Sequence, residues 1–259
     1  MRTQSLVLRS FLLFMLLSHW TLSAGSALPQ QLTAEERRQV TRLLGVNTSS
    51  KLLSHPYPLG GYQGLEAGVS LQLVDTSDLD GMGCTPGSPG CPAASKDLLR
   101  ELRLTRIHLG KGLYSNVDLF FHFSPPLGSH LSREFGALLR WNFYQSSFNP
   151  TQLTAVIHSN QLNYADSFTA QTLGGLLVLG VYFPQRSIYL GLGYLQSTGT
   201  FSGGDGSNAT ILNSISLSES VQEFHSLVGA SLDFGPWFLA LQVDRYQDMV
   251  YSAKLGVRL

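Results

Sequence analysis

Charged residues are scarce in this chain of 259 residues. Asp, Glu, Lys and Arg together account for 13% of it, about half of the usual share in a soluble domain. The 17 acidic and 17 basic residues balance, and no long run of basic residues occurs, which argues against binding to nucleic acid. Apolar residues make up 43% of the chain and aromatic residues 10%, a composition that excludes an intrinsically disordered protein.

Long apolar runs are also lacking. The most apolar internal stretch, residues 173–183, contains three glycines and is too short for a membrane-spanning helix, which takes roughly 20 residues. The N-terminus carries two arginines, a short apolar core at 11–17 and small residues at 23–27. This pattern predicts a secretory signal peptide over 1–27 rather than a membrane anchor. We therefore expect an exported protein that either is soluble or crosses a membrane without helices.

Alternation of apolar and polar residues fills most of the chain beyond residue 63. In residues 65–73 (LEAGVSLQL), apolar residues take the odd positions and Glu, Gly, Ser and Gln take the even ones, as in a strand with one apolar face. The pattern predicts ten strands of about nine to eleven residues, the length with which a tilted strand spans a membrane. The alternating residues that mark these strands lie at 65–73, 102–109, 116–123, 135–144, 153–158, 173–183, 188–194, 224–234, 237–244 and 251–259.

The second of these strands needs a defect to fit the pattern. Leu102 and Leu104 share one face, but Ile107 and Leu109 have the opposite parity. One extra residue at 105–106 restores the alternation, so we expect a β-bulge there.

All charges of the predicted strands fall on one face in this interpretation. They are Glu66, Arg103, Arg106, Asp118, Arg140, Asp233, Asp244, Lys254 and Arg258. A soluble barrel turns such a face to water, whereas a membrane barrel turns it to its lumen, so alternation alone does not decide between them. Three features favour the membrane barrel: glycines on the polar face, aromatic residues near the strand ends, and long connections at 74–98 and 197–221 that alternate with tight turns.

The signal peptide, the alternating strands, the loop pattern and a last strand that runs to residue 259 (YSAKLGVRL) resemble the bacterial outer-membrane β-barrel proteins. The resemblance covers residues 64–259. It implies a closed antiparallel transmembrane β-barrel of about ten strands in the bacterial outer membrane, with both chain ends in the periplasm. Its partners would be outer-membrane lipids and the outer-membrane assembly machinery, and the oligomeric state stays open. Members of this class usually end in an aromatic residue, whereas this chain ends in Leu259.

Residues 28–63 precede the first strand and form an N-terminal periplasmic segment in this interpretation. Thr33 and Glu36 have the spacing of a capping box, and apolar residues then recur on one helical face, so we expect a short helix over 34–44. The favoured placement of this helix is on the periplasmic surface. The alternative is a helix that enters or plugs the lumen.

Cysteine is rare as well. Cys84 and Cys91 are the two cysteines of the chain, and they flank a Gly- and Pro-rich segment in the first long loop. In an exported protein such a pair predicts a disulfide. The spacing differs from that of CxxC redox and metal motifs.

Histidines supply the main candidates for chemistry. His122, His158 and His225 face the predicted lumen toward its outer end, and Asp244 lies on the strand beside that of His225. A His–Asp pair could act as a general base, and a cluster of histidines could hold a metal ion. The favoured interpretation of these residues and of Arg140 is a structural network in the lumen, because buried charges need partners. No cofactor and no metal are expected.

Three functions fit these features. The leading one is a small, non-enzymatic outer-membrane barrel with a structural, surface-interaction or narrow-pore role, because about eight strands already close around side chains and ten leave little free lumen. The second is an outer-membrane enzyme that acts at the external rim, with His225 and Asp244 as weak catalytic candidates. The third is a soluble exported β-barrel that binds an apolar ligand inside.

Overall fold

The computed structural model describes residues 32–79, 82, 101–114, 116–125, 132–164, 167–202 and 216–259. The predicted signal peptide lies outside the described residues, and so do both partners of the predicted disulfide, Cys84 and Cys91.

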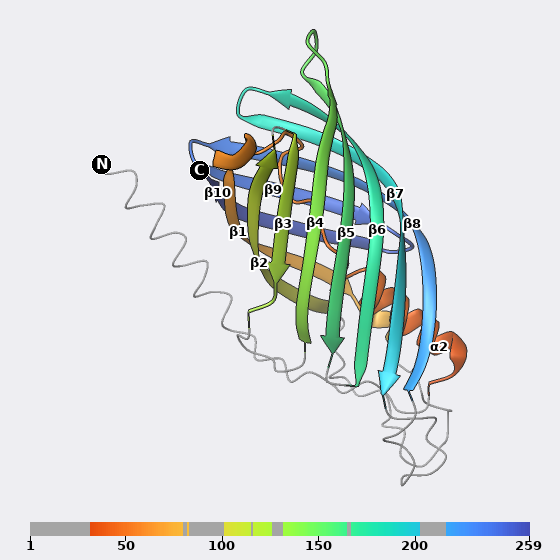
Figure 1. Cartoon of the computed structure of the whole chain (residues 1–259). Helices are drawn as coiled ribbons and strands as arrows, with labels where there is room; N and C mark the ends of the chain where they lie inside the picture. The colour runs from red at the N-terminus through yellow and green to blue at the C-terminus, as the bar shows by residue number, and fades with distance from the viewer. Residues whose placement is uncertain are drawn as a thin grey trace.

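Ten antiparallel strands close into a barrel, in which each strand pairs with its neighbours along the chain and β1 pairs with β10 (Figure 1). The strands are β1 (Leu65–Asp75), β2 (Glu101–Tyr114), β3 (Val117–Phe123), β4 (Ser132–Gln145), β5 (Thr151–Tyr164), β6 (Phe168–Phe183), β7 (Arg186–Ser202), β8 (Ser216–Phe234), β9 (Trp237–Arg245) and β10 (Met249–Arg258). The predicted fold class, a closed antiparallel barrel of ten strands with a short N-terminal helix, is confirmed.

The two ends of the barrel differ in the length of their connections. The short-turn end, at the top of Figure 1, has the connections 115–116, 146–150, 184–185 and 235–236. The opposite end is the long-loop end, where the strands are joined by the connections 76–100, 124–131, 165–167, 203–215 and 246–248. The last residue belongs to the short-turn end, because the backbone N–H of Leu259 donates to the carbonyl oxygen of Leu65 at 3.0 Å.

Six strands are longer than the alternation predicts. β2, β4 and β5 have 14 residues each. β6, β7 and β8 have 16, 17 and 19 residues. β9 has 9 residues and pairs with β8 only from Ser226 onward, so β8 projects beyond it at the long-loop end. β7 and β8 stay paired out to Ser202 and Ser216, inside the predicted loop 197–221. The alternation does not predict a strand here, because the outward-facing residues are Ser, Thr and Gln, so that polar residues occupy both faces of much of this stretch.

The bulge predicted in the second strand is wrong. β2 pairs with β1 in continuous register over their whole shared length, and the irregularity lies instead between Gly112 and Tyr114, opposite β3. Leu104 is therefore buried inside the barrel, and Arg103 points outward with 56% of its side chain exposed. The apolar parity breaks at Leu104 because this leucine packs within the barrel, and Arg103 is the one charge of the predicted polar face that lies outside.

The outer wall is apolar in its middle and aromatic at its borders. Leu177 on β6 and Leu190 on β7 are 61% and 54% exposed. Toward the long-loop end, the rings of Tyr194 and Phe224 pack with centroids 5.4 Å apart. Other outward aromatic residues near the strand ends are Phe123, Phe135 and Tyr251 toward the long-loop end, and Phe143, Phe183, Phe234 and Trp237 toward the short-turn end. The wall therefore has an apolar belt between two aromatic borders.

Four charged residues of the strands are fully enclosed in the barrel. Arg106, Asp118, Arg140 and Asp244 are completely buried. Buried charge and exposed apolar surface together are the reverse of the distribution in a soluble protein.

A short helix precedes the barrel. α2 covers Ala34–Val40 and continues as a π-helix over Thr41–Val46. Thr33 and Glu36 form the predicted capping box, since the Glu36 N–H donates to the Thr33 hydroxyl at 3.3 Å and the Thr33 N–H donates to the Glu36 carboxylate at 2.7 Å. The start of the predicted helix is thus confirmed.

Within the described part of the chain, no helix has the length and apolar character that a membrane-spanning helix needs.

Candidate functional site

The lumen of the barrel is occupied by the chain's own N-terminal segment. We call residues 33–60 the plug. α2 lies at the long-loop end, the extended residues that follow pass through the lumen, and the Gly61–Gln63 turn lies against β2 at the short-turn end (Figure 1). All residues from Leu43 to Ser54 are buried. Of the two placements that the sequence leaves open, the structure therefore has the one inside the barrel.

Ion pairs hold the helical part of the plug at the long-loop end. Arg37 Nη2 lies 3.1 Å from Glu219 Oε1, and Arg42 Nε lies 2.6 Å from Glu223 Oε1. Both glutamates belong to the part of β8 that projects beyond β9. The apolar side of the helix packs in a buried cluster that includes Phe168. The extension of β8 thus serves as a wall for the plug.

Arg106 on β2 binds the backbone of the plug. Its Nε and Nη2 atoms lie 2.8 and 2.6 Å from the two oxygens of Glu134. The same guanidinium donates to the carbonyl oxygens of Thr48 and Ser49, and Asn160 Nδ2 donates to Thr48 at 3.1 Å. One buried arginine thereby pairs with a wall carboxylate and satisfies carbonyl groups of an extended segment that lies outside the sheet.

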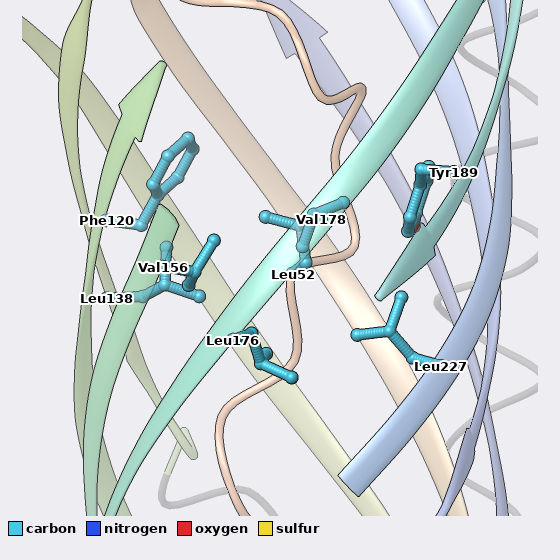
Figure 2. Close-up of a cluster of buried hydrophobic side chains, with 8 residues drawn as sticks. All are labelled: Leu52, Phe120, Leu138, Val156, Leu176, Val178, Tyr189 and Leu227. Atoms are coloured by element: carbon cyan, nitrogen blue, oxygen red, sulfur yellow. The ribbon is translucent and has the colours of Figure 1, made fainter. Parts of the chain in front are cut away.

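Leu52 anchors the plug at the middle of the lumen. It packs among buried side chains of the wall, which are Phe120, Leu138, Val156, Leu176, Val178, Tyr189 and Leu227 (Figure 2). The N–H of the next residue, Leu53, donates to Gln242 Oε1 at 3.0 Å. Leu59 of the plug packs against the same cluster. Inward-facing residues of the strands therefore include an apolar core that binds the plug.

Arg140 on β4 repeats the arrangement nearer the short-turn end. Its Nε and Nη2 atoms lie 3.0 and 2.8 Å from Asp118 Oδ2. The guanidinium also donates to the carbonyl oxygens of His55 and Tyr57. Asp118 Oδ1 in turn accepts the backbone N–H of Leu59 at 3.1 Å. Arg140 was predicted to belong to a structural network in the lumen, and its partners are the wall and the plug.

Glu66 forms a third charged site. Lys254 Nζ lies 2.6 Å from one of its oxygens, and Arg258 Nε lies 2.9 Å from the other. The hydroxyl of Ser54 in the plug donates to the same carboxylate at 2.7 Å. Arg258 also pairs with Asp233. The buried charges of the lumen therefore occur in neutralising groups that reach the plug.

The two weak catalytic candidates do form a pair. His225 Nε2 lies 2.7 Å from Asp244 Oδ1, and Gln242 Nε2 donates to both oxygens of Asp244 at 2.8 and 3.0 Å. Lys51 of the plug adds a cation 3.9 Å from Asp244 Oδ2. His225 and Asp244 are 1% and 0% exposed, so the pair lies beneath the plug rather than at an open rim.

Tyr246 completes this cluster from the β9–β10 connection. Its ring stacks on that of His225 with centroids 4.4 Å apart. Its hydroxyl bonds to the Ser49 hydroxyl at 2.7 Å and accepts from Lys51. Burial raises the pKa of the Tyr246 phenol well above its usual value, so the ring stays neutral. The cluster joins the plug to two strands, and its buried, paired side chains indicate a structural role.

The other two predicted histidines lie elsewhere on the wall. His122 Nε2 bonds to Asn160 Oδ1 at 3.1 Å, and its ring lies 5.4 Å from that of His108. His158 is buried, and neither of its ring nitrogens has a hydrogen-bond partner among the described residues. In the same part of the chain, no three His, Cys, Asp or Glu side chains gather as metal ligands would.

Sequence reasoning missed several members of these clusters. Glu134 lies just outside the predicted strand residues 135–144, and Lys51 lies in the segment predicted to precede the barrel. His108 and Tyr246 were not considered. Lys51 offered the one usable signal, because it is an isolated charge within a run of small and apolar residues (NTSSKLLS).

A cavity of about 660 Å³ opens at the short-turn end of the lumen. Tyr57 of the plug, Tyr182, Trp237 and Arg258 are among the residues that line it. The packed cluster around Leu52 lies further along the same lumen. The cavity is therefore a vestibule at the mouth of a filled barrel.

Comparisons with known proteins give distant similarities only. The chain is similar over 77% of its length to 99% of the crystal structure of Ail, the attachment invasion locus protein of Yersinia pestis, at 12% identity and a TM-score of 0.29. For Neisserial surface protein A the shares are 76% and 95%, at 10% identity and a TM-score of 0.28. For the translocator domain of the autotransporter NalP from Neisseria meningitidis they are 87% and 95%, at 13% identity and a TM-score of 0.35. No protein-family model and no curated protein matches the chain. The fold assignment therefore rests on the strand pairing of this chain itself.

Proposed function

We propose that this chain is a bacterial outer-membrane β-barrel protein whose lumen is closed by its own N-terminal segment. Its role is structural or in surface interaction rather than in transport. The observation that carries the proposal is the inverted surface: Leu177 on the outside is 61% exposed, whereas Arg106 and Arg140 are completely buried inside. Lipid can solvate such an exterior, and paired charges suit such a lumen.

The plug argues against a pore. Leu52 packs among wall residues from six strands, and Arg106 and Arg140 bind plug carbonyls on either side of it. A solute path would need all of these contacts to open together. The narrow-pore variant of the function is therefore less favoured than a closed barrel.

The two alternative functions are also less favoured. An enzyme at the external rim would need access to His225 and Asp244, but both are buried next to Lys51 of the plug. A soluble barrel with an apolar ligand inside would need a polar exterior and an apolar cavity. This barrel has an apolar exterior and a lumen filled with charges and plug.

Membrane fractionation tests the proposal. The protein should stay in the membrane pellet through washes with sodium carbonate and urea, and it should need detergent for extraction. Leu177→Arg, which lies in the middle of the apolar belt, should destabilise the inserted barrel by about 2–4 kcal/mol, because a lipid-facing cation is costly near the midplane.

The matched control is Gln196→Arg. Gln196 also faces outward, but it lies beyond Tyr194 at the long-loop border, where the same cation costs about 0–1 kcal/mol. A protein that is soluble without detergent, with Leu177→Arg as stable as Gln196→Arg, would contradict the membrane assignment.

A further inference from the structure

We infer that the chain crosses the membrane an odd number of times, so that α2 lies on the outer face together with the long loops, opposite Tyr62 and Leu259. This inference rests on the proposed membrane location. It departs from the usual topology of outer-membrane barrels, in which an even number of strands leaves both chain ends in the periplasm.

The plug connects the two ends of the barrel within a few residues. At the long-loop end, Asn47 Nδ2 donates to Asp248 Oδ2 in the β9–β10 connection at 3.3 Å. At the short-turn end, the Tyr57 hydroxyl donates to the carbonyl oxygen of Pro150 in the β4–β5 connection at 3.0 Å. The ten residues from Asn47 to Tyr57 can reach about 33–36 Å when extended, which exceeds an apolar band of about 25 Å. This stretch therefore makes one complete passage.

The strands do not undo this passage. β1 starts at the short-turn end, where the N–H of Gly112 donates to the carbonyl oxygen of Gly64 at 3.0 Å, and β10 ends there as well. Ten strands return the chain to the end at which they began, so the plug makes the eleventh passage. The inference also takes the predicted signal-peptide cleavage near Ala27 as a premise: about four residues then precede Leu32, and they reach about 14 Å at most. They are too few to cross back.

The wall is shaped to hold the plug, so the passage is part of the folded state. A Cβ atom on Gly199 of β7 would lie 2.2 Å from Thr41 Oγ1, and one on Gly180 of β6 would lie 2.3 Å from Pro56 Cγ. Contacts this short leave no room for a larger residue on the wall. Asn142 Nδ2 donates to the Pro56 carbonyl oxygen at 2.9 Å. Without the plug, these glycines would leave gaps, and the buried donors of the wall would lack acceptors.

In this topology the N-terminal segment has a second role besides closing the lumen. It carries the start of its own mature chain through the membrane and displays α2 beside the long loops. Any segment joined to that end is presented on the same side. The helix offers Glu35 and Arg38 there, with 79% and 55% of their side chains exposed.

Labelling of single cysteines tests the inference. In the full-length Cys84→Ser, Cys91→Ser background, Glu35→Cys and Tyr62→Cys place thiols on exposed residues at opposite ends of the plug. Intact cells are treated with a membrane-impermeant maleimide. Glu35→Cys should be labelled at least tenfold more than Tyr62→Cys, and Tyr62→Cys should become reactive once the outer membrane is permeabilised.

Phe148→Cys is the matched control, because Phe148 is 94% exposed in the β4–β5 connection at the short-turn end. It should behave like Tyr62→Cys. Arg38→Cys is a second reporter on α2, should Glu35→Cys not reach the membrane. Equal labelling of α2 and Tyr62 from one side would overturn the inference, and so would protection of α2 with labelling of Tyr62. Release of the wild-type protein by a carbonate wash would instead overturn the membrane location itself, which separates the two failures.

Discussion

Arg106→Met tests whether the wall holds the plug through buried arginines. The change removes two hydrogen bonds to Glu134 and the donors to the Thr48 and Ser49 carbonyl oxygens. Removing one partner of a buried ion pair costs about 3–5 kcal/mol, because the remaining charge is left without compensation. We therefore expect the free energy of unfolding to fall by about 3–5 kcal/mol.

A second variant separates the two parts of this loss. Arg106→Met with Glu134→Met removes the stranded carboxylate and should recover part of the stability. The plug carbonyls would still lack their donor, and an unsatisfied buried group costs about 1–3 kcal/mol. Arg103→Met is the control on the same strand: its exposed pair with Glu101, at 3.3 Å, contributes about 0–1 kcal/mol.

Urea unfolding of the purified protein in detergent micelles measures these differences, with tryptophan fluorescence as the signal. Two results would refute the reasoning. One is an Arg106→Met protein as stable as Arg103→Met. The other is a double variant that is no more stable than Arg106→Met alone, because the loss could then not come from the stranded Glu134.

Three further outcomes are expected. The full-length protein in a planar lipid bilayer should show no steady conductance, and a stable ohmic channel would mean that the lumen is open. Gly136→Val should lower the free energy of unfolding by about 1–3 kcal/mol by overpacking, since a Cβ there would lie 2.3 Å from the His122 ring. Gly175→Val is the control, because its Cβ would meet only Val156 O at 3.9 Å. Urea titration should show a smaller loss of stability for Gly175→Val. Cys84→Ser with Cys91→Ser should leave barrel assembly intact and raise only the protease sensitivity of the first long loop on whole cells; two free thiols in the untreated protein, found by alkylation and mass measurement, would speak against the disulfide.

The barrel was predictable because period-two alternation is a local signal. Residues such as Leu177 and Leu190 repeat it within each strand, and strand pairing then follows chain order. The pattern failed at Leu104, whose apolar side chain predicts an outward position although it is buried inside the barrel. It also failed at the projecting ends of β7 and β8, where polar residues face outward.

The sequence leaves a helix that plugs the lumen open as an alternative but does not favour it, because the contacts that hold the plug join residues far apart in the chain. The stretch around Lys51 (NTSSKLLSHPY) has no helical or strand pattern. Its burial depends on Arg106 and Arg140, which lie on strands far along the chain. The pairing of His225 with Asp244 was predicted from their places on neighbouring strands. Their burial by the plug was not predicted.

A crosslink between the plug and the wall tests the central claim most directly. A Cβ built on Gly45 lies 3.2 Å from Ser197 Cβ on β7, close to the span of about 3.5–4.5 Å in a disulfide. Gly45→Cys with Ser197→Cys, in the Cys84→Ser, Cys91→Ser background, is oxidised mildly after folding and digested for mass spectrometry. Gly45→Cys with Ser187→Cys, at the other end of β7, is the control. We expect a disulfide between residues 45 and 197 and none between 45 and 187. Free thiols at both 45 and 197 in a folded barrel would show that the N-terminal segment does not occupy the lumen.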